Sequence, residues 1–196
     1  MEFTGERPTL EREMEGSRAR YHSVLPFCEN KSVLDIGCGI GHGSFLIASH
    51  NNNRSVVGYD TSAEAIQEAE KLFQRSNLFF VCDKENLQSY IIGHDLICMI
   101  ESIEHFEHAE AIELIRSISG CGKEFVGTTP NGVLFPYHPQ GPGEYRGFHK
   151  WHFTIDELNT ILAELFQFVE IYGHMYDPKI QQFTSYTFFG SNRTVL

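Results

Sequence analysis

Two stretches of the sequence combine residue types that can do chemistry. The first, D-I-G-C-G-I-G-H-G at residues 35–43, directly follows an apolar run. Glycines at this spacing allow a tight turn and let a ligand approach the backbone closely, with the start of a helix behind it. The dinucleotide fingerprint G-x-G-x-x-G is not satisfied in any register, so the loop by itself does not indicate a dinucleotide.

Two aspartates follow the next two apolar runs of the chain. Asp60 ends the run at residues 55–60, and Asp83 comes directly after the run at residues 77–82. A carboxylate at the first of these places can accept hydrogen bonds from both hydroxyls of a ribose. A carboxylate at the second place can meet the amino group of an adenine. Together with the glycine loop, the two aspartates predict a nucleoside-containing ligand.

The second stretch is E-S-I-E-H-F-E-H at residues 101–108, in which five side chains can ionise or bind a metal. The dipole of a following helix would favour Glu107 at its start. It explains Glu101 and Glu104 less well, because these two follow an apolar run, where the reactive group of a ligand is expected. Carboxylates and imidazoles together suit a divalent cation, whereas His105 alone could act as a general base.

The elements that must position these residues follow from hydrophobic patterning. Amphipathic stretches predict helices, the last of which opens with the capping box Thr154-x-x-Glu157. The predicted helices span residues 8–25, 41–50, 62–75, 109–119 and 154–166. The predicted strands span residues 32–37, 55–60, 77–82, 94–100, 124–128, 168–173 and 183–190.

This alternation predicts an α/β fold with a doubly wound, seven-stranded, mostly parallel sheet that has helices on both faces. The last two strands follow each other directly, which predicts an antiparallel C-terminal hairpin. In such sheets ligands bind at the carboxyl ends of the strands. Both reactive stretches come at such ends.

Composition excludes several classes of protein. The 196 residues suit a single domain, and 15 Lys and Arg against 26 Asp and Glu give a net charge of −11. Nucleic-acid binding is disfavoured, because phosphate contacts need clustered basic residues. No apolar run is long enough for a bilayer, and the charged first twenty residues do not resemble a secretory signal. The five cysteines contain no C-x-x-C pair, which favours a reduced, cytoplasmic protein.

The glycine loop, Asp60 and Asp83 together resemble the class I S-adenosylmethionine-dependent methyltransferases. The resemblance implies a Rossmann-like fold and S-adenosylmethionine as the cofactor. It also implies a set of cofactor-binding residues along the ends of the first four strands. They are Asp35, Gly37, Cys38, Gly39, Gly41, Asp60, Thr61, Asp83, Lys84 and Glu101.

The spacing E-x-x-E-H resembles two groups of this superfamily, the small-RNA terminal 2′-O-methyltransferases and the ubiquinone-pathway O-methyltransferases. By this resemblance Glu101, Glu104 and His105 bind a divalent cation, Mg or Mn, and His149 from a later loop completes the site. The cation would acidify the hydroxyl that accepts the methyl group. The catalytic roles then belong to His105, His149 and Glu104.

Further motifs resemble a branch whose members are often encoded near, or fused to, glycosyltransferases of surface polysaccharides. These motifs are FTGERP at residues 3–8, the R-Y pair at residues 20–21, TTPN at residues 128–131 and the FH…FT stretch at residues 148–154. The branch implies O-methylation of a sugar hydroxyl, for example on rhamnose, beside or fused to a glycosyltransferase. It also implies that the N-terminal segment closes over the cofactor, with Thr4, Glu6 and Arg7 near it.

The chain is therefore expected to be one methyltransferase domain over residues 1–196. Residues 1–30 would form a helical lid, and residues 129–153 a substrate loop. Aromatic side chains of this loop would stack on a carbohydrate or another small hydroxylated acceptor. They are Tyr137, Tyr145, Phe148 and Trp151.

Three alternatives stay open at this stage. A small-RNA 2′-O-methyltransferase is favoured by E-x-x-E-H and disfavoured by the net charge. A ubiquinone-type enzyme would methylate a phenol, and its lipidic substrate would call for a membrane-surface helix that the charged N-terminal stretch does not provide. A cofactor-binding regulatory protein without activity would require decay of the reactive residues, which the sequence retains.

Overall fold

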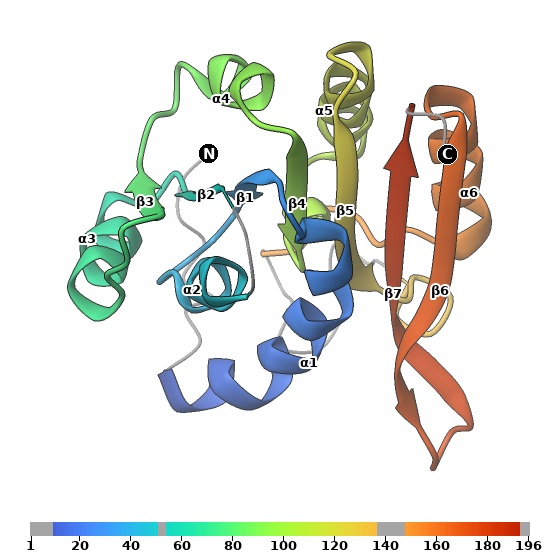
Figure 1. Cartoon of the computed structure of the whole chain (residues 1–196). Coiled ribbons are helices and arrows are strands. Elements are labelled where there is room, and N and C mark those ends of the chain that lie inside the picture. Colours follow the sequence, from blue (N-terminus) through green and yellow to red (C-terminus); the bar gives the residue numbers. More distant parts are fainter. Residues whose placement is uncertain (1–9, 51–53, 137–147, 193–196) are drawn as a thin grey trace. The chain divides into compact units, whose positions relative to one another are not determined.

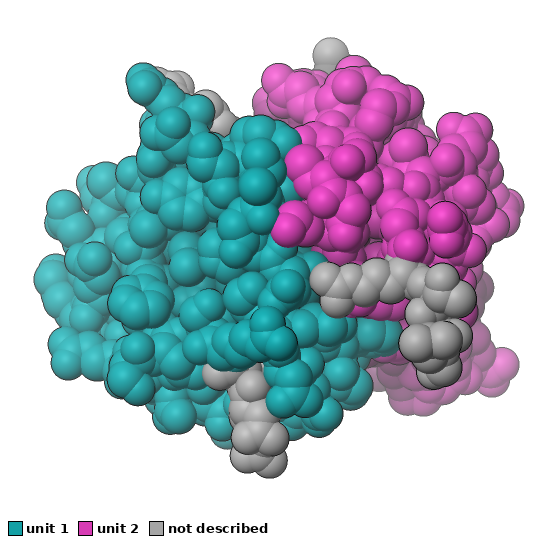
Figure 2. Space-filling view, turned by 45° about the horizontal axis from the view of Figure 1, so that its top comes forward, with its two compact units in different colours: residues 1–100 teal, residues 101–196 magenta. Residues whose placement is uncertain are grey.

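The computed structural model describes residues 10–50, 54–136 and 148–192 (Figure 1). The chain divides into two compact units, Met1–Ile100 and Glu101–Leu196, which Figure 2 colours separately. Each unit is described by itself. The organisation of the whole chain as a single domain stays a prediction.

The first unit contains a parallel sheet. Its strands are β1 (Ser32–Ile36), β2 (Ser55–Tyr59), β3 (Leu78–Val81) and β4 (Leu96–Ile100), in the order β3-β2-β1-β4. All five residues of β4 are buried, which agrees with its uninterrupted apolar sequence. The bounds of each of these four strands lie within two residues of the predicted ones.

Four helices accompany this sheet: α1 (Leu10–Cys28), α2 (His42–Ser49), α3 (Ala63–Leu72) and α4 (Leu87–Gly93). Three of them were predicted, and the predicted N-cap of α3, Ser62, is confirmed, because its side chain accepts a hydrogen bond from the Ala65 amide. The sequence analysis did not predict α4. It is a single short helix in which only Ile91 is buried, so it has no apolar stripe to reveal it.

Helix α1 packs against α2 within the first unit. The contact is close because Gly43 has no side chain. A Cβ at Gly43 would lie 1.8 Å from the ring of Tyr21, a buried residue of α1. The predicted helix of the N-terminal segment is thus confirmed for residues 10–28, while residues 1–9, with Thr4, Glu6 and Arg7, lie outside the described residues.

The second unit consists of the short 3-10 helix η1 (Ile103–His105), helices α5 (His108–Gly120) and α6 (Ile155–Leu165), and three strands. Strand β7 (Gln182–Ser191) pairs antiparallel with both β5 (Glu124–Pro130) and β6 (Phe168–Asp177). The predicted capping box at the start of α6 is present, with both of its hydrogen bonds.

The C-terminal hairpin of β6 and β7 is confirmed and is longer than predicted. Its outer residues, such as Tyr176 and Phe183, are exposed aromatic residues that pair across the hairpin with ring centroids 5.3 Å apart. The sequence at these positions does not alternate between apolar and polar residues, which is the pattern that predicts a half-buried strand. Parallel strands alternating with helices, followed by this antiparallel hairpin, confirm the predicted α/β fold with seven strands.

Among the described residues, no helix combines the length and the apolar character needed to cross a membrane.

Candidate functional site

The glycine loop of the first unit joins β1 to α2. Gly37, Gly39 and Gly41 have φ angles of 79°, 55° and 84°, in the left-handed region that favours glycine. A Cβ at Gly41 would also lie 2.6 Å from the Phe80 ring, so a larger residue would not fit. Because Gly41 cannot cap α2 with a side chain, the amides at the helix start can serve a bound anion. The loop therefore has the backbone expected of a ligand cradle.

Asp60 ties the end of β2 to this loop. Its carboxylate accepts a hydrogen bond from the Gly39 amide at 2.9 Å and another from the Ser62 amide at 2.8 Å. A carboxylate has about four acceptor positions, so two amide bonds leave it capacity for ribose hydroxyls. Asp60 and its neighbour Thr61 are half-buried. The contact of both with a cofactor stays a prediction.

Asp83 builds the turn that precedes α4. Its carboxylate accepts hydrogen bonds from the Glu85 and Asn86 amides and from the Asn86 side chain, at 3.0–3.2 Å. The hydrogen bond from the Asn86 side chain is the largest of the causes that lower the pKa of Asp83. The sequence analysis predicted Asp83 and Lys84, which is exposed, and did not predict Asn86, although Asp and Asn are both residues that favour turns.

Asp35 is buried, in contrast to Asp60 and Asp83. It accepts hydrogen bonds from the Ser44 hydroxyl at 2.6 Å and from the Tyr21 hydroxyl at 3.2 Å. Burial raises its pKa from 3.8 to about 6, and the charge of Asp60 adds to the effect. The neighbouring Cys38 is buried as well, and burial raises the pKa of its thiol. Asp35 thus connects β1 to α1 and α2. The sequence analysis did not predict that Tyr21 takes part in this connection.

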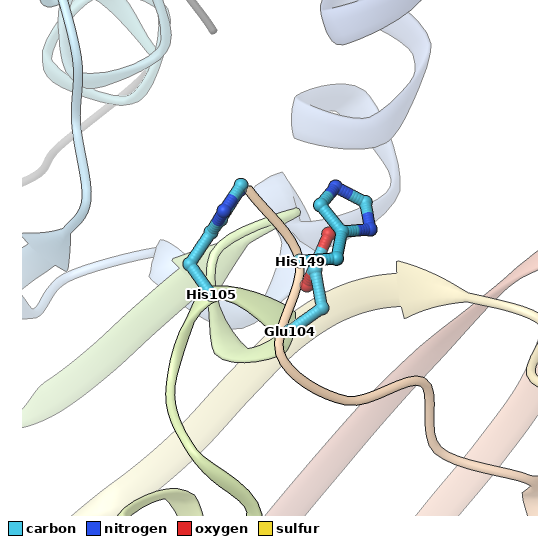
Figure 3. A group of neighbouring side chains, drawn as sticks. All are labelled: Glu104, His105 and His149. Carbon is cyan, nitrogen blue, oxygen red and sulfur yellow. The ribbon is translucent and has the colours of Figure 1, made fainter. Parts of the chain in front are cut away.

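The second unit brings three of the predicted reactive residues together. Glu104 and His105 come from η1, and His149 comes from a segment that follows β5 (Figure 3). One potential ligand atom of each residue lies within 4.8 Å of the others. Glu104 is completely buried, and His149 is 5% exposed. We call these three residues the carboxylate–imidazole cluster.

Backbone hydrogen bonds hold the two parts of this cluster against each other. The carbonyl of Glu104 accepts from the amides of Lys150 at 2.7 Å and Trp151 at 3.2 Å. In return, Nδ1 of His105 bonds to the carbonyl of Phe148 at 3.1 Å. The side chain of Glu104 accepts a hydrogen bond from Thr129 at 3.3 Å. The cluster is therefore assembled by the fold itself.

Glu101 is not brought into this cluster. Its amide donates to the carbonyl of Thr128 at 3.0 Å, and its carboxylate accepts from the Thr128 hydroxyl at 2.9 Å. Its φ angle is 47°, a left-handed conformation that is strained for a residue other than glycine. Thr128 therefore holds Glu101 in a conformation that its own backbone does not favour. Its predicted binding of metal and cofactor stays a prediction.

The aromatic residues of the predicted substrate loop are placed only in part. Trp151 is half-buried, with its ring centroid 4.4 Å from that of His108, and its indole N–H donates to the Glu157 carboxylate. Trp151 thus anchors the segment that carries His149. Tyr137 and Tyr145 lie outside the described residues. The ion pair of His108 with Glu157, at 2.7 Å, was not predicted, because the two residues belong to different helices.

The donor set of the cluster fits a divalent cation. One carboxylate and two imidazoles suit Mn, Fe or Zn better than Mg, which prefers oxygen ligands alone. A buried carboxylate is costly unless a positive charge or hydrogen bonds compensate it, and a cation between Glu104 and the imidazoles would do so.

Comparisons with known proteins find similarity to methyltransferases. A family model described as a methyltransferase domain matches residues 33–124. A probable S-adenosylmethionine-dependent methyltransferase of Mycobacterium tuberculosis is 27% identical over 190 residues, which cover 91% of this chain and 66% of that relative. One of Mycolicibacterium smegmatis is 26% identical over 157 residues, covering 78% of this chain and 55% of the relative. This chain therefore spans less than two thirds of the length of these relatives.

Solved structures share the fold at low sequence identity. The methyltransferase domain of a bacterial Hen1, CtHen1, has a TM-score of 0.69 at 20% identity, over 90% of this chain and 99% of that one. The plantazolicin methyltransferase BamL has a TM-score of 0.69 at 18% identity, over 92% of this chain and 88% of that one. The small RNA methyltransferase HEN1 has a TM-score of 0.68 at 18% identity, over 100% of this chain and 27% of that one.

The family model, the relatives and the solved structures thus make this chain similar to S-adenosylmethionine-dependent methyltransferases, in sequence over residues 33–124 and in fold over most of its length.

Proposed function

We propose that this protein transfers a methyl group from S-adenosylmethionine to a hydroxyl oxygen of a sugar, with the help of a divalent cation. The observation that carries the proposal is the carboxylate–imidazole cluster of Glu104, His105 and His149, whose potential ligand atoms lie within 4.8 Å of one another. A methyltransferase that needed only to orient a reactive nucleophile would have no use for three such groups. A hydroxyl is a poor nucleophile at neutral pH and needs to lose its proton.

The reaction is a single displacement. The acceptor oxygen forms a bond to the methyl carbon, the carbon–sulfur bond breaks, and S-adenosylhomocysteine leaves with the electron pair. The hydroxyl proton must go to a base. A divalent cation held by Glu104, His105 and His149 would supply Lewis acidity toward the hydroxyl. Holding the two reactants in line then supplies much of the rate enhancement.

We assign separate tasks to the residues of the two units. In the first unit, the glycine loop would hold the methionine part of the cofactor, and Asp60 would bind the ribose through the acceptor capacity that its two amide bonds leave. In the second unit, Glu104, His105 and His149 would bind the cation, which we expect to be Mn rather than Mg. Removal of the cation would leave His105 or His149 as the base.

The acceptor that we propose is a carbohydrate, such as a glycan or a terminal deoxyhexose like rhamnose. The net charge of −11 disfavours a phosphate backbone and places no obstacle before an uncharged sugar. The motif resemblance to enzymes found beside polysaccharide glycosyltransferases supports the same acceptor. The reaction then belongs to glycan biosynthesis, with a glycosyltransferase as the neighbouring activity.

Transfer of labelled methyl groups from S-adenosylmethionine to an acceptor panel tests the proposal. The panel contains rhamnosides and other deoxyhexose glycosides, catechols and short RNA duplexes, each with and without a chelator and with Mn²⁺ added back. We expect label on a glycoside, loss of transfer with the chelator, and recovery with Mn²⁺. If methyl transfer to a glycoside continues in the presence of the chelator, the result would contradict the role of the cation and support the carbohydrate acceptor.

Two variants make this experiment specific to the cluster. Glu104→Gln keeps the shape of a completely buried side chain and removes its charge, so we expect at least a hundredfold loss of Mn²⁺-dependent transfer. Glu110→Gln makes the same change on the exposed face of α5 and should retain full activity. Equal activities of the two variants would remove the cluster from the reaction.

A small-RNA 2′-O-methyltransferase is the second candidate, and one observation favours it. The chain has the fold of CtHen1 and HEN1, and it brings the second Glu and the His of E-x-x-E-H together with a later histidine in one cluster. The 2′-hydroxyl is also a sugar hydroxyl, so the same cation chemistry would serve it. Label on RNA alone, at low salt, would favour this candidate over the carbohydrate. Label on catechol alone would favour the phenol enzyme.

A further inference from the structure

The rings of His105, His149 and His152 are in contact, and only His105 and His149 belong to the carboxylate–imidazole cluster. The ring of His149 contacts those of both His105 and His152, with a centroid distance of 4.8 Å to each. Nδ1 of His149 is hydrogen-bonded to Nε2 of His152, and Nδ1 of His152 is hydrogen-bonded to the carbonyl of Phe135. His149 and His152 are 5% and 7% exposed, so water has little access to this chain of hydrogen bonds.

The protons in this chain can be assigned from its last member. A carbonyl oxygen only accepts, so Nδ1 of His152 carries a proton and donates it to Phe135. A neutral His152 then has its lone pair on Nε2 and must accept from His149. Nδ1 of His149 therefore carries a proton, and the lone pair of a neutral His149 is on Nε2.

We propose that His152 is a positioning residue that holds His149 in the Nδ1–H tautomer, through its hydrogen bond to the Phe135 carbonyl, so that Nε2 of His149 is the cation ligand. The inference rests on the proposed function, because it assigns a ligand atom to the cation site. It also gives a task to a histidine that the sequence did not distinguish from an ordinary loop residue. Histidines that bind metals commonly donate their other ring N–H to a fixed acceptor.

The same logic applies to the second imidazole of the cluster. Nδ1 of His105 is bonded to the carbonyl of Phe148 at 3.1 Å, so it carries the proton and the lone pair is on Nε2. Both imidazoles are thus set in the same tautomer by acceptors of the backbone, directly for His105 and through His152 for His149. A histidine side chain in water prefers the other tautomer, Nε2–H, so these hydrogen bonds hold both rings in the less common form before any cation binds.

Nitrogen NMR of the imidazole rings tests the tautomer without cation or cofactor. The long-range proton–nitrogen spectrum of the labelled wild-type protein should show His149 with a protonated Nδ1 and a bare Nε2. His149→Gln identifies its signals by their loss. In His152→Leu the acceptor is gone, and we expect His149 to shift toward the Nε2–H form. His152→Gln keeps an acceptor toward His149 and a donor toward Phe135, and should retain the wild-type tautomer.

Affinity for Mn²⁺, measured by titration calorimetry on the same proteins, tests the consequence. We expect His152→Leu to raise the Kd about 10–100-fold, and His152→Gln to stay within about threefold of the wild type. His94→Gln is the matched control, because it removes a histidine whose Nδ1 is bonded to the Tyr90 carbonyl in the first unit. Thermal unfolding of each variant shows whether it is folded.

The inference would be overturned by Nε2–H on His149 in the wild-type spectrum, or by a His152→Leu protein that is folded and keeps both the tautomer and the Mn²⁺ affinity. A tautomer change without a change in affinity would also contradict the positioning role. A wild-type protein that binds no Mn²⁺ would contradict the cation in the proposed function. In that case the NMR spectra would still test whether the hydrogen bonds to His152 and Phe135 set the tautomer of His149.

Discussion

Gly41 shows at the scale of one residue how the ligand cradle restricts the sequence. Two separate demands meet there: a φ angle of 84°, and the absence of a side chain, because a Cβ would lie 2.6 Å from Phe80 and 2.7 Å from Ala69. Gly122 meets only the first demand, since its φ angle is 66° and a Cβ there would have open space around it. The pair therefore separates backbone strain from packing.

The losses in the free energy of unfolding caused by Gly41→Ala and Gly122→Ala should differ by the contribution of packing at Gly41. We expect Gly122→Ala to lower the free energy of unfolding by about 1 kcal/mol through backbone strain alone. Gly41→Ala should lower it by about 3 kcal/mol, because the clash with the Phe80 ring adds to the same strain. Urea unfolding of both variants measures the two values. Equal losses would mean that Phe80 moves aside at no cost.

Asp35 makes a prediction about pH, because its pKa in the folded protein is raised from 3.8 to about 6 by burial. Between these two values the folded state binds more protons than the unfolded state. The contribution of Asp35 to stability is therefore fully present below pH 3.8 and is lost as the pH rises through about 6. Two pKa units correspond to about 3 kcal/mol.

Asp35→Asn removes this titration and can still accept hydrogen bonds from Ser44 and Tyr21. We expect the stability of the wild-type protein, measured relative to Asp35→Asn, to fall by about 2 kcal/mol between pH 4 and pH 7, which is most of the full effect. Other titrating groups cancel in the difference between the two proteins. Parallel stability curves across this range would show that Asp35 keeps an ordinary pKa.

At the scale of elements, the start of α6 secures the segment that carries His149. Thr154 and Glu157 form the capping box, and the Glu157 carboxylate also binds Trp151 and His108. One side chain thus fixes the N-terminus of a helix, the preceding segment and the start of α5. A cation site built on this segment gains its precision from these contacts rather than from a strand or helix of its own.

Removal of the cap should loosen this arrangement. Thr154→Ala loses the hydrogen bond to the Glu157 amide, and we expect a loss of about 1 kcal/mol in the free energy of unfolding. Thr160→Ala is the matched control, because Thr160 lies exposed within the same helix, and it should stay within about 0.5 kcal/mol of the wild type. Denaturant unfolding compares them. A larger loss for Thr160→Ala would contradict the importance of the cap.

At the scale of the whole molecule, the open question is whether the two units unfold together. The sequence has a single tryptophan, Trp151, which belongs to the second unit. Its fluorescence therefore reports on the second unit alone, whereas far-ultraviolet circular dichroism reports on the helices of both. If residues 1–196 form one domain, as predicted, the two signals should follow one cooperative transition.

S-adenosylhomocysteine provides the second half of this experiment. Its predicted contacts are nearly all in the first unit, so a gain in stability that Trp151 also reports would mean that the units unfold as one. At one hundred times its Kd, we expect both transitions to gain about 2.7 kcal/mol. A gain confined to circular dichroism, with an unchanged fluorescence midpoint, would show two independently unfolding domains.

Local patterns in the sequence were sufficient for most of the fold. Alternating apolar runs and amphipathic stretches predicted the seven strands and all helices except α4 and the short η1, and Thr154-x-x-Glu157 predicted the start of α6. The glycine loop and Asp60 predicted a nucleoside ligand of the first unit. These features depend on neighbours within a few residues, so hydrophobic periodicity and residue chemistry express them directly.

The tertiary structure decided what depends on residues far apart in the chain. Burial of Asp35 depends on Tyr21 in another helix, and the cluster depends on hydrogen bonds between segments 43 residues apart. Glu101, which the motif places beside Glu104, is held instead by Thr128. His152 matches no motif, and only its contacts with His149 and Phe135 distinguish it. Residue types and spacing state which chemistry is available, and three-dimensional contacts select the atoms that perform it.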